Sequence, residues 1–324
     1  MRYVGGIDIG GTKCAVSIGE VQNMTVKTLE KIKFPTPSGP KASIQAMIRA
    51  LRELTEKHPQ CPLEAVGVSC GSPLDSRRGM ILAPPNLPDW IDVDIVTPFE
   101  KEFGVPAALQ NDANACALAE WMWGAGKGSR NMIFLTFGTG MGAGLILDGR
   151  LYTGTNDMAG EAGHVRLASD GPVGYHKAGS FEGFCSGGGI ARMGAAMIKE
   201  HLSRGGSTSI LPPGTEPDQV TTADIGRAAQ SGDPLALCIM ERAGEKLGMG
   251  LAMLVDILNP QVIVIGSIFL RQEAILRPAM ERILSREALS YNLNVCRVVP
   301  AGLGEELGDY AAFSVAMNKL REVQ

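Results

Sequence analysis

The sequence opens with Tyr3-Val-Gly-Gly-Ile-Asp8-Ile-Gly10-Gly11-Thr12-Lys13, which Cys-Ala-Val-Ser-Ile follows. This pattern predicts a strand with an acid near its end, a glycine turn and a second strand. It returns as Asn131-Met-Ile-Phe-Leu-Thr136-Phe-Gly138-Thr139-Gly140-Met-Gly142-Ala-Gly144. Glycine allows close approach of the backbone, and exposed amides with threonine hydroxyls bind anionic oxygen. Two such loops in one chain therefore predict a split phosphate-binding site.

Two other phosphate motifs do not fit these loops. A Walker loop needs Lys-Ser or Lys-Thr directly after its last glycine, and neither loop has it. Residues 138–143 satisfy the loose dinucleotide fingerprint, but that fingerprint must open a helix, whereas residues 144–152 predict a strand and a turn. Ordinary glycine hairpins would explain one loop. Two loops, with Asp8 and a threonine pair in matching places, favour an ATP-dependent phosphotransferase.

Length and composition indicate a two-domain α/β enzyme. The chain has 324 residues, more than a single core usually serves, with 45% apolar and 5% aromatic residues. Its net charge of −4 is spread without a basic block, which argues against nucleic acid or an anionic membrane as partner. The seven scattered cysteines are typical of reduced core residues. With no signal peptide and no uninterrupted membrane span, we expect a cytoplasmic protein.

The order strand, hairpin, helix, strand, helix occurs in both halves of the chain and predicts an internal duplication. We expect two similar α/β lobes with a cleft between them. The predicted boundaries are 1–115, joined by the final helix at 310–324, and 116–309. The periodicity predicts helices at 43–57, 97–103, 113–123, 190–202, 222–231, 234–258, 271–289 and 310–321, and strands at 65–70, 105–112, 262–265 and 295–300.

Six segments resemble the ROK sugar kinases, within the actin-like and hexokinase-like ATPase superfamily. They are Asp8-Ile-Gly-Gly-Thr-Lys13, Asn111-Asp112-Ala-Asn114, residues 136–144, Gly160-Glu161-Ala-Gly-His164, Asn259-Pro260 with residues 262–266, and residues 307–312. The resemblance implies two ribonuclease-H-like lobes that hold sugar and ATP in the cleft. It also implies Mg²⁺ as cofactor and, for many members, a homodimer.

Asp112 is the candidate catalytic base. It follows a predicted strand, at the edge where open α/β sheets place ligands, and its carboxylate could accept the proton of the attacking hydroxyl. It could instead cap the next helix, although Asn111 and Asn114 are equally good caps. The family pattern makes Asp112 the base.

The resemblance assigns the nucleotide contacts. Asp8 is expected to hold Mg²⁺ through water, and Lys13 either assists the phosphates or is solvated. The remaining positions are Gly10, Gly11 and Thr12 in the first loop, Thr136, Gly138, Thr139 and Gly140 in the second, and Gly266 with Ser267 at the adenosine. The family usually has more glycine at 266–269, so we expect the adenosine contact to differ.

The sugar is expected to contact paired polar side chains, because an unpaired buried polar group is costly. The family positions are Asn111, Asp112, Glu161, His164 and Glu182. Asn86, in the loop that precedes Trp90, either joins them or forms a turn between prolines. For Glu161 the alternative is a surface acid.

Many ROK proteins hold a structural zinc with three cysteines that follow the Glu-x-Gly-His segment. Here Val173, Tyr175 and Ser180 occupy those places, and His164 alone cannot make a tetrahedral site. A site rebuilt from His164, His176 and Cys185 has too few clear ligands. We therefore predict no structural zinc and expect Tyr175, Phe181 and Phe184 to pack the loop instead.

The leading hypothesis is a hexose kinase that phosphorylates the 6-hydroxyl, with glucose as the default substrate. Mannose, allose, fructose and an N-acyl hexosamine (N-acetylmannosamine or N-acetylglucosamine) remain open. A sugar-responsive repressor needs a DNA-binding segment before the first loop, and we expect no room for it before Asp8. The third hypothesis is an idle sugar-binding protein, which the intact Asp8, Asp112 and loops disfavour.

Overall fold

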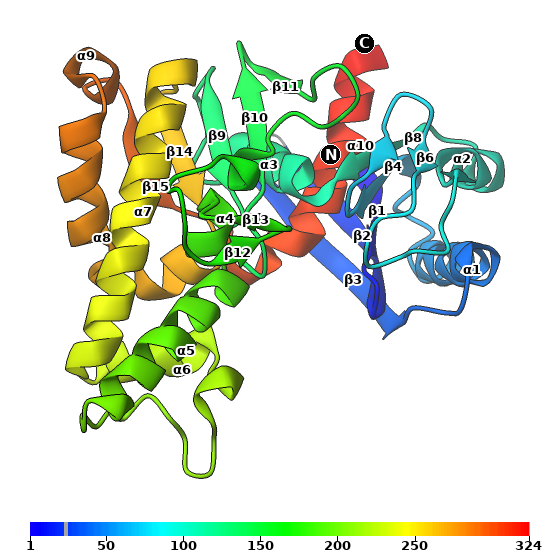
Figure 1. Cartoon of the computed structure of the whole chain (residues 1–324). Helices are drawn as coiled ribbons and strands as arrows, with labels where there is room; N and C mark the ends of the chain where they lie inside the picture. Colours follow the sequence, from blue (N-terminus) through cyan, green and yellow to red (C-terminus); the bar gives the residue numbers. More distant parts are fainter. Residues whose placement is uncertain (23–24, 324) are drawn as a thin grey trace. The chain divides into compact units, whose positions relative to one another are not determined.

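The computed structural model describes residues 1–22 and 25–323, which form two compact units (Figure 1). Unit 1 comprises Met1–Phe134, Gly144–Ala159 and Gly302–Gln324, and unit 2 comprises Leu135–Ala143 and Gly160–Ala301. Within the described ranges, no helix is long and apolar enough to cross a membrane. The lobe boundaries derived from the sequence stay a prediction.

The first sheet orders its strands β3-β2-β1-β4-β8. The strands are β1 (Arg2–Ile9), β2 (Lys13–Gln22), β3 (Thr25–Pro35), β4 (Leu63–Cys70) and β8 (Ala107–Asn111). The first three are antiparallel, while β1, β4 and β8 are parallel. In register, Ile9 pairs with Cys70, and Cys70 pairs with Asn111. The carboxyl ends of three strands therefore meet at one edge of this sheet.

Helices cover both faces of the first sheet. On one face, α1 (Pro40–Lys57) and α2 (Val96–Phe103) bury residues such as Leu51 and Phe99 against the sheet. On the other face, α10 (Leu307–Val323) and α3 (Asp112–Met122) pack around Phe313. A Cβ on Gly67 of β4 would lie 2.0 Å from the carbonyl oxygen of Ala312. Glycine is therefore required where α10 meets the sheet.

The second sheet repeats the strand order of the first, as β11-β10-β9-β14-β15. Its strands are β9 (Met132–Leu135), β10 (Ala143–Leu147), β11 (Arg150–Tyr152), β14 (Val262–Ile265) and β15 (Arg297–Pro300). Again an antiparallel hairpin comes first, and a parallel pair follows. The α/β fold predicted from the sequence is confirmed, and the repeated order supports the internal duplication.

The main helices of unit 2 are α5 (Gly187–Ser203), α6 (Thr222–Gln230), α7 (Pro234–Leu258) and α8 (Ile268–Glu287). Asp233 caps α7 by accepting from the amides of Leu235 and Ala236, and Asn259 ends it in the left-handed region with φ of 44°. Both positions favour these residue types, because Asp caps helices and Asn tolerates positive φ. The predicted span of 234–258 is confirmed.

The remaining elements are short. They are β5 (Leu74–Asp75), β6 (Met80–Ile81), β7 (Val93–Asp94), β12 (Val173–Gly174), β13 (Lys177–Ala178), α4 (Phe181–Phe184), α9 (Ser290–Leu293) and the 3₁₀ turns Ala162–His164, Pro217–Gln219 and Gly304–Glu306. β5, β6 and β7 form a small sheet, and β12 pairs with β13.

Candidate functional site

The first glycine loop is a tight turn between β1 and β2. The amide of Gly10 donates to the carbonyl of Lys13 at 3.0 Å, and the Thr36 hydroxyl donates to the carbonyl of Gly10 at 2.6 Å. Gly11, Thr12 and Lys13 remain exposed. The loop thus offers amide, hydroxyl and ammonium donors to an anion at the edge where β1 ends.

Asn86 lies beside this loop. A Cβ on Gly11 would be 2.4 Å from the carbonyl oxygen of Asn86, and one on Gly71 would be 3.3 Å from its amide oxygen. Asn86 also lies in a turn, in which the amide of Leu87 donates to the carbonyl of Pro84 at 2.8 Å. Both interpretations of Asn86 therefore hold locally: it belongs to a turn, and its exposed side chain lies at the end of β4.

The structure separates the roles of Asn111 and Asp112. The cap of α3 is Asn111, whose side-chain oxygen accepts from the amide of Asn114 at 3.0 Å. Its Nδ2 donates to the hydroxyl of Ser72 at 2.7 Å. Asp112 is the first residue of α3, and its Oδ1 accepts from the amide of Ala113 at 2.8 Å. Helix capping therefore does not account for Asp112, and its carboxylate retains acceptor capacity.

Asp8 and Asp112 lie near each other at one edge of the first sheet. Both side chains reach solvent, but they stand among protein atoms that displace water. This desolvation raises the pKa of Asp112. It also raises the pKa of Asp8. The positive charge of Lys31 opposes this rise and the negative charges of Asp112 and Asp309 add to it, so that the pKa of Asp8 is about 6. Neighbouring carboxylates with perturbed pKa values are typical of functional sites.

The thiol of Cys70 reports the same proximity. Burial, together with the charges on Asp112 and Asp8, raises its pKa to about 12. Cys70 ends β4, and its register partners Ile9 and Asn111 follow Asp8 and precede Asp112 in the chain. The strand order of the first sheet thus brings the two acids together.

The residues of unit 1 fit Mg²⁺ carried by a nucleotide better than a dedicated metal cage. Among residues 1–22 and 25–323, no three His, Cys, Asp or Glu side chains group closely enough to hold an ion. Mg²⁺ in phosphotransferases commonly uses one or two carboxylates together with substrate phosphates. Asp8, beside the exposed Gly11 and Thr12, is the carboxylate that fits this requirement.

The second glycine loop belongs to unit 2 and is closed by its own threonine. The amide of Thr136 donates to the carbonyl of Gly142 at 3.0 Å, and the amide of Gly142 donates back to the Thr136 hydroxyl at 2.9 Å. At the tip, the amide of Gly138 donates to the carbonyl of Gly140 at 3.0 Å, and Thr139 is exposed. Thr136 therefore shapes the loop, whereas Thr139 is available to a ligand.

Glu182 and residues 160–164 pack against the second loop. The Oε2 of Glu182 accepts from the amide of Met141 at 3.1 Å. A Cβ on Gly163 would lie 2.1 Å from the carbonyl oxygen of Met141, and one on Gly160 would lie 2.0 Å from that of Ala143. Glu161 and His164 lie on this crowded segment with exposed side chains. Three predicted sugar positions are thus gathered beside one phosphate loop.

A pocket of about 480 Å³ in unit 2 opens beside Gly138 and Thr139. The starts of α5, α6 and α8 line it, and helix starts attract anions through free amides. Ser267, at the predicted adenosine position, has φ of 51° and ψ of −106°, a conformation that favours glycine. Arg271 donates to its hydroxyl at 3.3 Å. The sequence indicated the Ser267 departure but not Arg271, Thr221 or Thr222, which the folded chain brings to this pocket.

A model of the ROK family matches residues 4–319. The chain belongs to the ROK family. It is 30% identical to a glucokinase of Streptomyces coelicolor over 313 residues, which are 96% of each chain. It is also 31% identical to a xylose repressor of Caldicellulosiruptor bescii over 230 residues, which cover 69% of this chain and 56% of the repressor. The family thus includes relatives named as enzymes and relatives named as regulators.

Two solved structures extend the comparison. A ROK hexokinase from Thermus thermophilus has a TM-score of 0.80 and 30% identity, over 99% of this chain and 100% of the hexokinase. A ROK glucokinase from Streptomyces griseus, solved with glucose and AMPPNP, has a TM-score of 0.76 and 28% identity, over 97% and 99% of the chains. The fold of this ROK protein is therefore that of sugar kinases.

Cations hold the loop in which many ROK proteins bind zinc. Lys177 donates to the carbonyl of His164 at 2.7 Å, Arg166 to that of Ala178 at 2.8 Å, and Arg192 to that of Val173 at 2.5 Å. The predicted packing is right for Phe181 and Phe184, which are buried. It is wrong for Tyr175, which is 67% exposed: its ring lies beside those of His164 and His176, with centroids 6.4 and 5.3 Å away, rather than in the core.

Proposed function

We propose that this ROK protein is an ATP-dependent sugar kinase that transfers the γ-phosphate of ATP to the 6-hydroxyl of a hexose, in the manner of a glucokinase. The observation that carries the proposal is the pair Asp8 and Asp112 at one edge of the first sheet, where the strand register brings them together and partial desolvation raises both pKa values. Phosphoryl transfer needs mainly positioning, charge neutralisation and an acceptor for the hydroxyl proton. The similarity to glucokinases adds support.

Asp112 is proposed as that acceptor. A raised pKa brings a carboxylate closer to neutral pH, where general bases work best. Asn111 is rigidly held by Asn114 and Ser72, so it can position a sugar hydroxyl next to Asp112. Asn86 is proposed as a further sugar contact of unit 1, and Glu161, His164 and Glu182 are proposed as the sugar contacts of unit 2. Hydrogen-bonding side chains of this kind reject sugars that leave them unpaired.

Each glycine loop is proposed, by itself, as a phosphate contact. Gly10, Gly11, Thr12 and Lys13 offer donors in unit 1, and Gly138, Thr139 and Gly140 offer them in unit 2. Thr136 shapes the second loop. The adenine ring of ATP is proposed to lie near Gly266 and Ser267, in the 480 Å³ pocket that Ser267 lines. Mg²⁺, when bound with the nucleotide, would be held at Asp8 and would neutralise phosphate charge. We further propose a cytoplasmic homodimer, to be checked by light scattering.

The test is ADP release with MgATP across glucose, mannose, allose, fructose, N-acetylmannosamine and N-acetylglucosamine. Asp112→Asn should lower turnover by about 10²- to 10⁴-fold while sugar binding persists. Asp148→Asn is the matched control, because its side chain is 82% exposed and pairs only with Arg130 on the surface. Turnover by Asp112→Asn at the control's rate would exclude Asp112 as the base.

The second candidate is a regulator that binds sugar without turnover, which the similarity to a xylose repressor favours. It predicts sugar binding by calorimetry with no ADP release from any sugar in the panel. The same panel, extended to xylose, therefore separates the two functions.

A further inference from the structure

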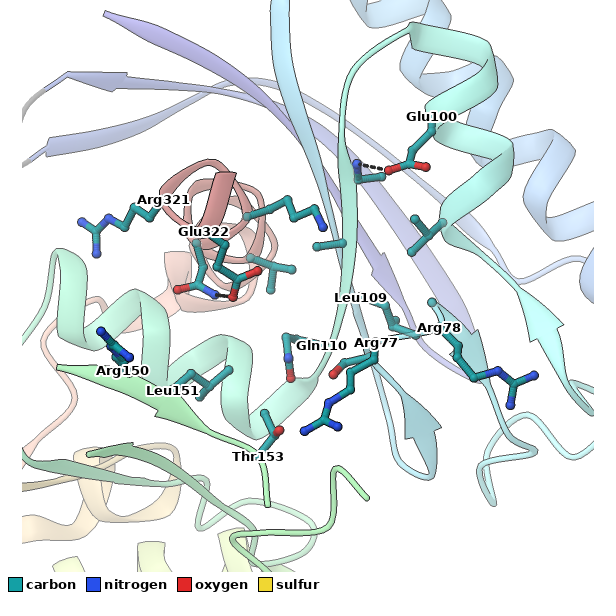
Figure 2. Close-up of a pocket in the computed structure, with 18 of the residues that line it drawn as sticks. Arg77, Arg78, Glu100, Leu109, Gln110, Arg150, Leu151, Thr153, Arg321 and Glu322 are labelled. Atoms are coloured by element: carbon teal, nitrogen blue, oxygen red, sulfur yellow. Dashed lines mark hydrogen bonds between the residues drawn. The ribbon is translucent and has the colours of Figure 1, made fainter. Parts of the chain in front are cut away.

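Unit 1 contains a cavity of about 900 Å³ that none of the proposed sugar and phosphate residues line. Edge strand β8 forms its floor, and α2, β11 and the end of α10 form its walls (Figure 2). Small-molecule sites typically have volumes of about 300–1,000 Å³. The cavity therefore has the size of a ligand site, and the proposed activity does not account for it.

Cations outnumber acids around this cavity. Five basic side chains line it: Arg77, Arg78, Arg150, Lys319 and Arg321. The two acids, Glu100 and Glu322, are already engaged. Glu100 accepts from the amide of Ala107 at 3.2 Å, and Glu322 accepts from Asn318 at 2.9 Å.

Most of these cations lack a close anion. Within residues 1–22 and 25–323, the side chains of Arg77, Arg150 and Lys319 form no ion pair, and Arg78 is 3.8 Å from Asp75. In Figure 2, Arg77 and Arg150 lie on opposite sides of the opening, with Gln110 and Thr153 between them. The unneutralised charge therefore comes from several residues of the lining rather than from one.

Arg321 is held in place and partly desolvated. Its guanidinium lies 5.3 Å from the ring centroid of Trp121, and burial lowers its pKa. Trp121 is itself fixed by a hydrogen bond from its Nε1 to the carbonyl of Ser129 at 2.8 Å. A stacked arginine is suited to bind a phosphate through its free edge.

The floor of the cavity disfavours an added peptide strand. β8 has only five residues, Pro106 precedes it, and Glu100 already occupies the outward amide of Ala107. Short edges, proline and nearby charges are devices that block strand pairing. An anionic small molecule therefore fits the cavity better than a polypeptide.

We propose that this cavity binds a small molecule that carries at least two phosphate groups. Five cations and only two acids line the cavity, and a single phosphate, with a charge of about −2, would leave part of this positive charge unmatched, whereas a bisphosphate can pair with several of the cations. Gln110, on the cavity floor, accepts from Nδ2 of Asn114 at 3.2 Å and directly precedes Asn111 and Asp112. The bound ligand therefore contacts the strand that ends at the proposed catalytic base. An effect of the bound ligand on turnover would rest on the proposed kinase function. Binding of the ligand to the cavity does not depend on that function.

The experiment is calorimetry with two probes, fructose 1,6-bisphosphate and inorganic pyrophosphate, in saturating AMPPNP so that the glycine loops are occupied. A preference between the two probes shows whether the cavity selects an organic phosphate ester or an inorganic polyphosphate. The double variant Arg77→Ser/Arg150→Ser should bind the preferred probe about 100-fold more weakly, because each of the two charge-assisted contacts contributes about one decade. The control Arg49→Ser/Lys127→Ser removes two exposed cations of unit 1 outside the cavity.

A second readout comes from Trp121. Binding should change tryptophan fluorescence in the wild type, and Trp121→Phe should remove that change while the heat of binding persists. Retained binding of one equivalent by the control variant, and its loss in the cavity variant, would support the proposal. It is overturned if neither probe binds beside AMPPNP, or if the cavity and control variants bind equally.

Discussion

Replacing Glu120 tests how α3, which begins with Asp112, is anchored in unit 1. The Glu120 side chain is fully buried. Its Oε2 accepts from the amides of Ala125 at 2.7 Å and Gly302 at 3.1 Å, and its Oε1 accepts from the amide of Leu303 at 3.0 Å. One carboxylate thus joins α3 to the segment that leads into α10.

The cost of each substitution follows from these three donors. In Glu120→Gln the new amide nitrogen must face at least one backbone N–H, which leaves a buried donor unpaired and costs about 2 kcal/mol. In Glu120→Ala all three donors lose their partner and a void forms, which costs about 4 kcal/mol. For a domain of about 150–250 residues, these values lower Tm by about 4–8 °C and 8–16 °C.

The assay is thermal unfolding followed by calorimetry, with Glu305→Gln as the control. Glu305 is exposed on the same segment, so its replacement should change the free energy of unfolding by less than about 0.5 kcal/mol. If Glu120→Gln has the same Tm as this control, the three hydrogen bonds do not anchor α3 and the reasoning fails.

Two further substitutions test the desolvated carboxylate of Asp8 and the backbone strain at Ser267. The pKa of Asp8 is about 6 in the folded state and 3.8 in the reference state, so the folded protein binds the proton more tightly and loses stability as pH rises from about 4 to 6. Above pH 6, Asp8→Asn should therefore have a free energy of unfolding about 1 kcal/mol higher than that of the wild type, a value that discounts the full pKa shift because the side chain is exposed. Near pH 4 the two proteins should be equally stable in thermal melts. A difference in stability that does not change with pH would contradict this. Ser267→Gly should raise the free energy of unfolding by about 1 kcal/mol in thermal melts, because glycine accepts φ of 51° and ψ of −106°. Ser285→Gly, inside α8, should lower it by a similar amount, and the same sign for both would exclude strain at Ser267.

The parts of the fold that the sequence predicted well have local causes. Glycine turns between β-branched strands predicted both hairpins, and a 3.6-residue apolar period predicted α7 to the residue. β3 was missed, because its sequence Thr-Val-Lys-Thr-Leu-Glu-Lys-Ile-Lys-Phe-Pro does not alternate cleanly and its side chains are only half-buried. An edge strand of this kind depends on its partner β2, with which it pairs along its length.

The candidate site was predictable only in part. Residue type alone does not decide which of Asn111 and Asp112 caps α3, since both are good caps. The structure decides it through the residue at which β8 ends. Arg271 was missed for a different reason: only the folded chain brings it to the pocket beside Gly138 and Thr139.

The carboxylates of unit 1 differ in a way that bears on function. Glu120 receives three backbone donors, an arrangement that stabilises the fold. Asp112 receives one, from Ala113, and within the described residues no side chain or amide donates to the Asp8 carboxylate. Folding alone would not favour two poorly paired acids at the ends of β1 and β8, the two strands that flank β4, because their charged forms are desolvated and repel each other. Such a cost is typical of residues retained for a ligand or a reaction, and it places the expected chemistry where β1 and β8 end.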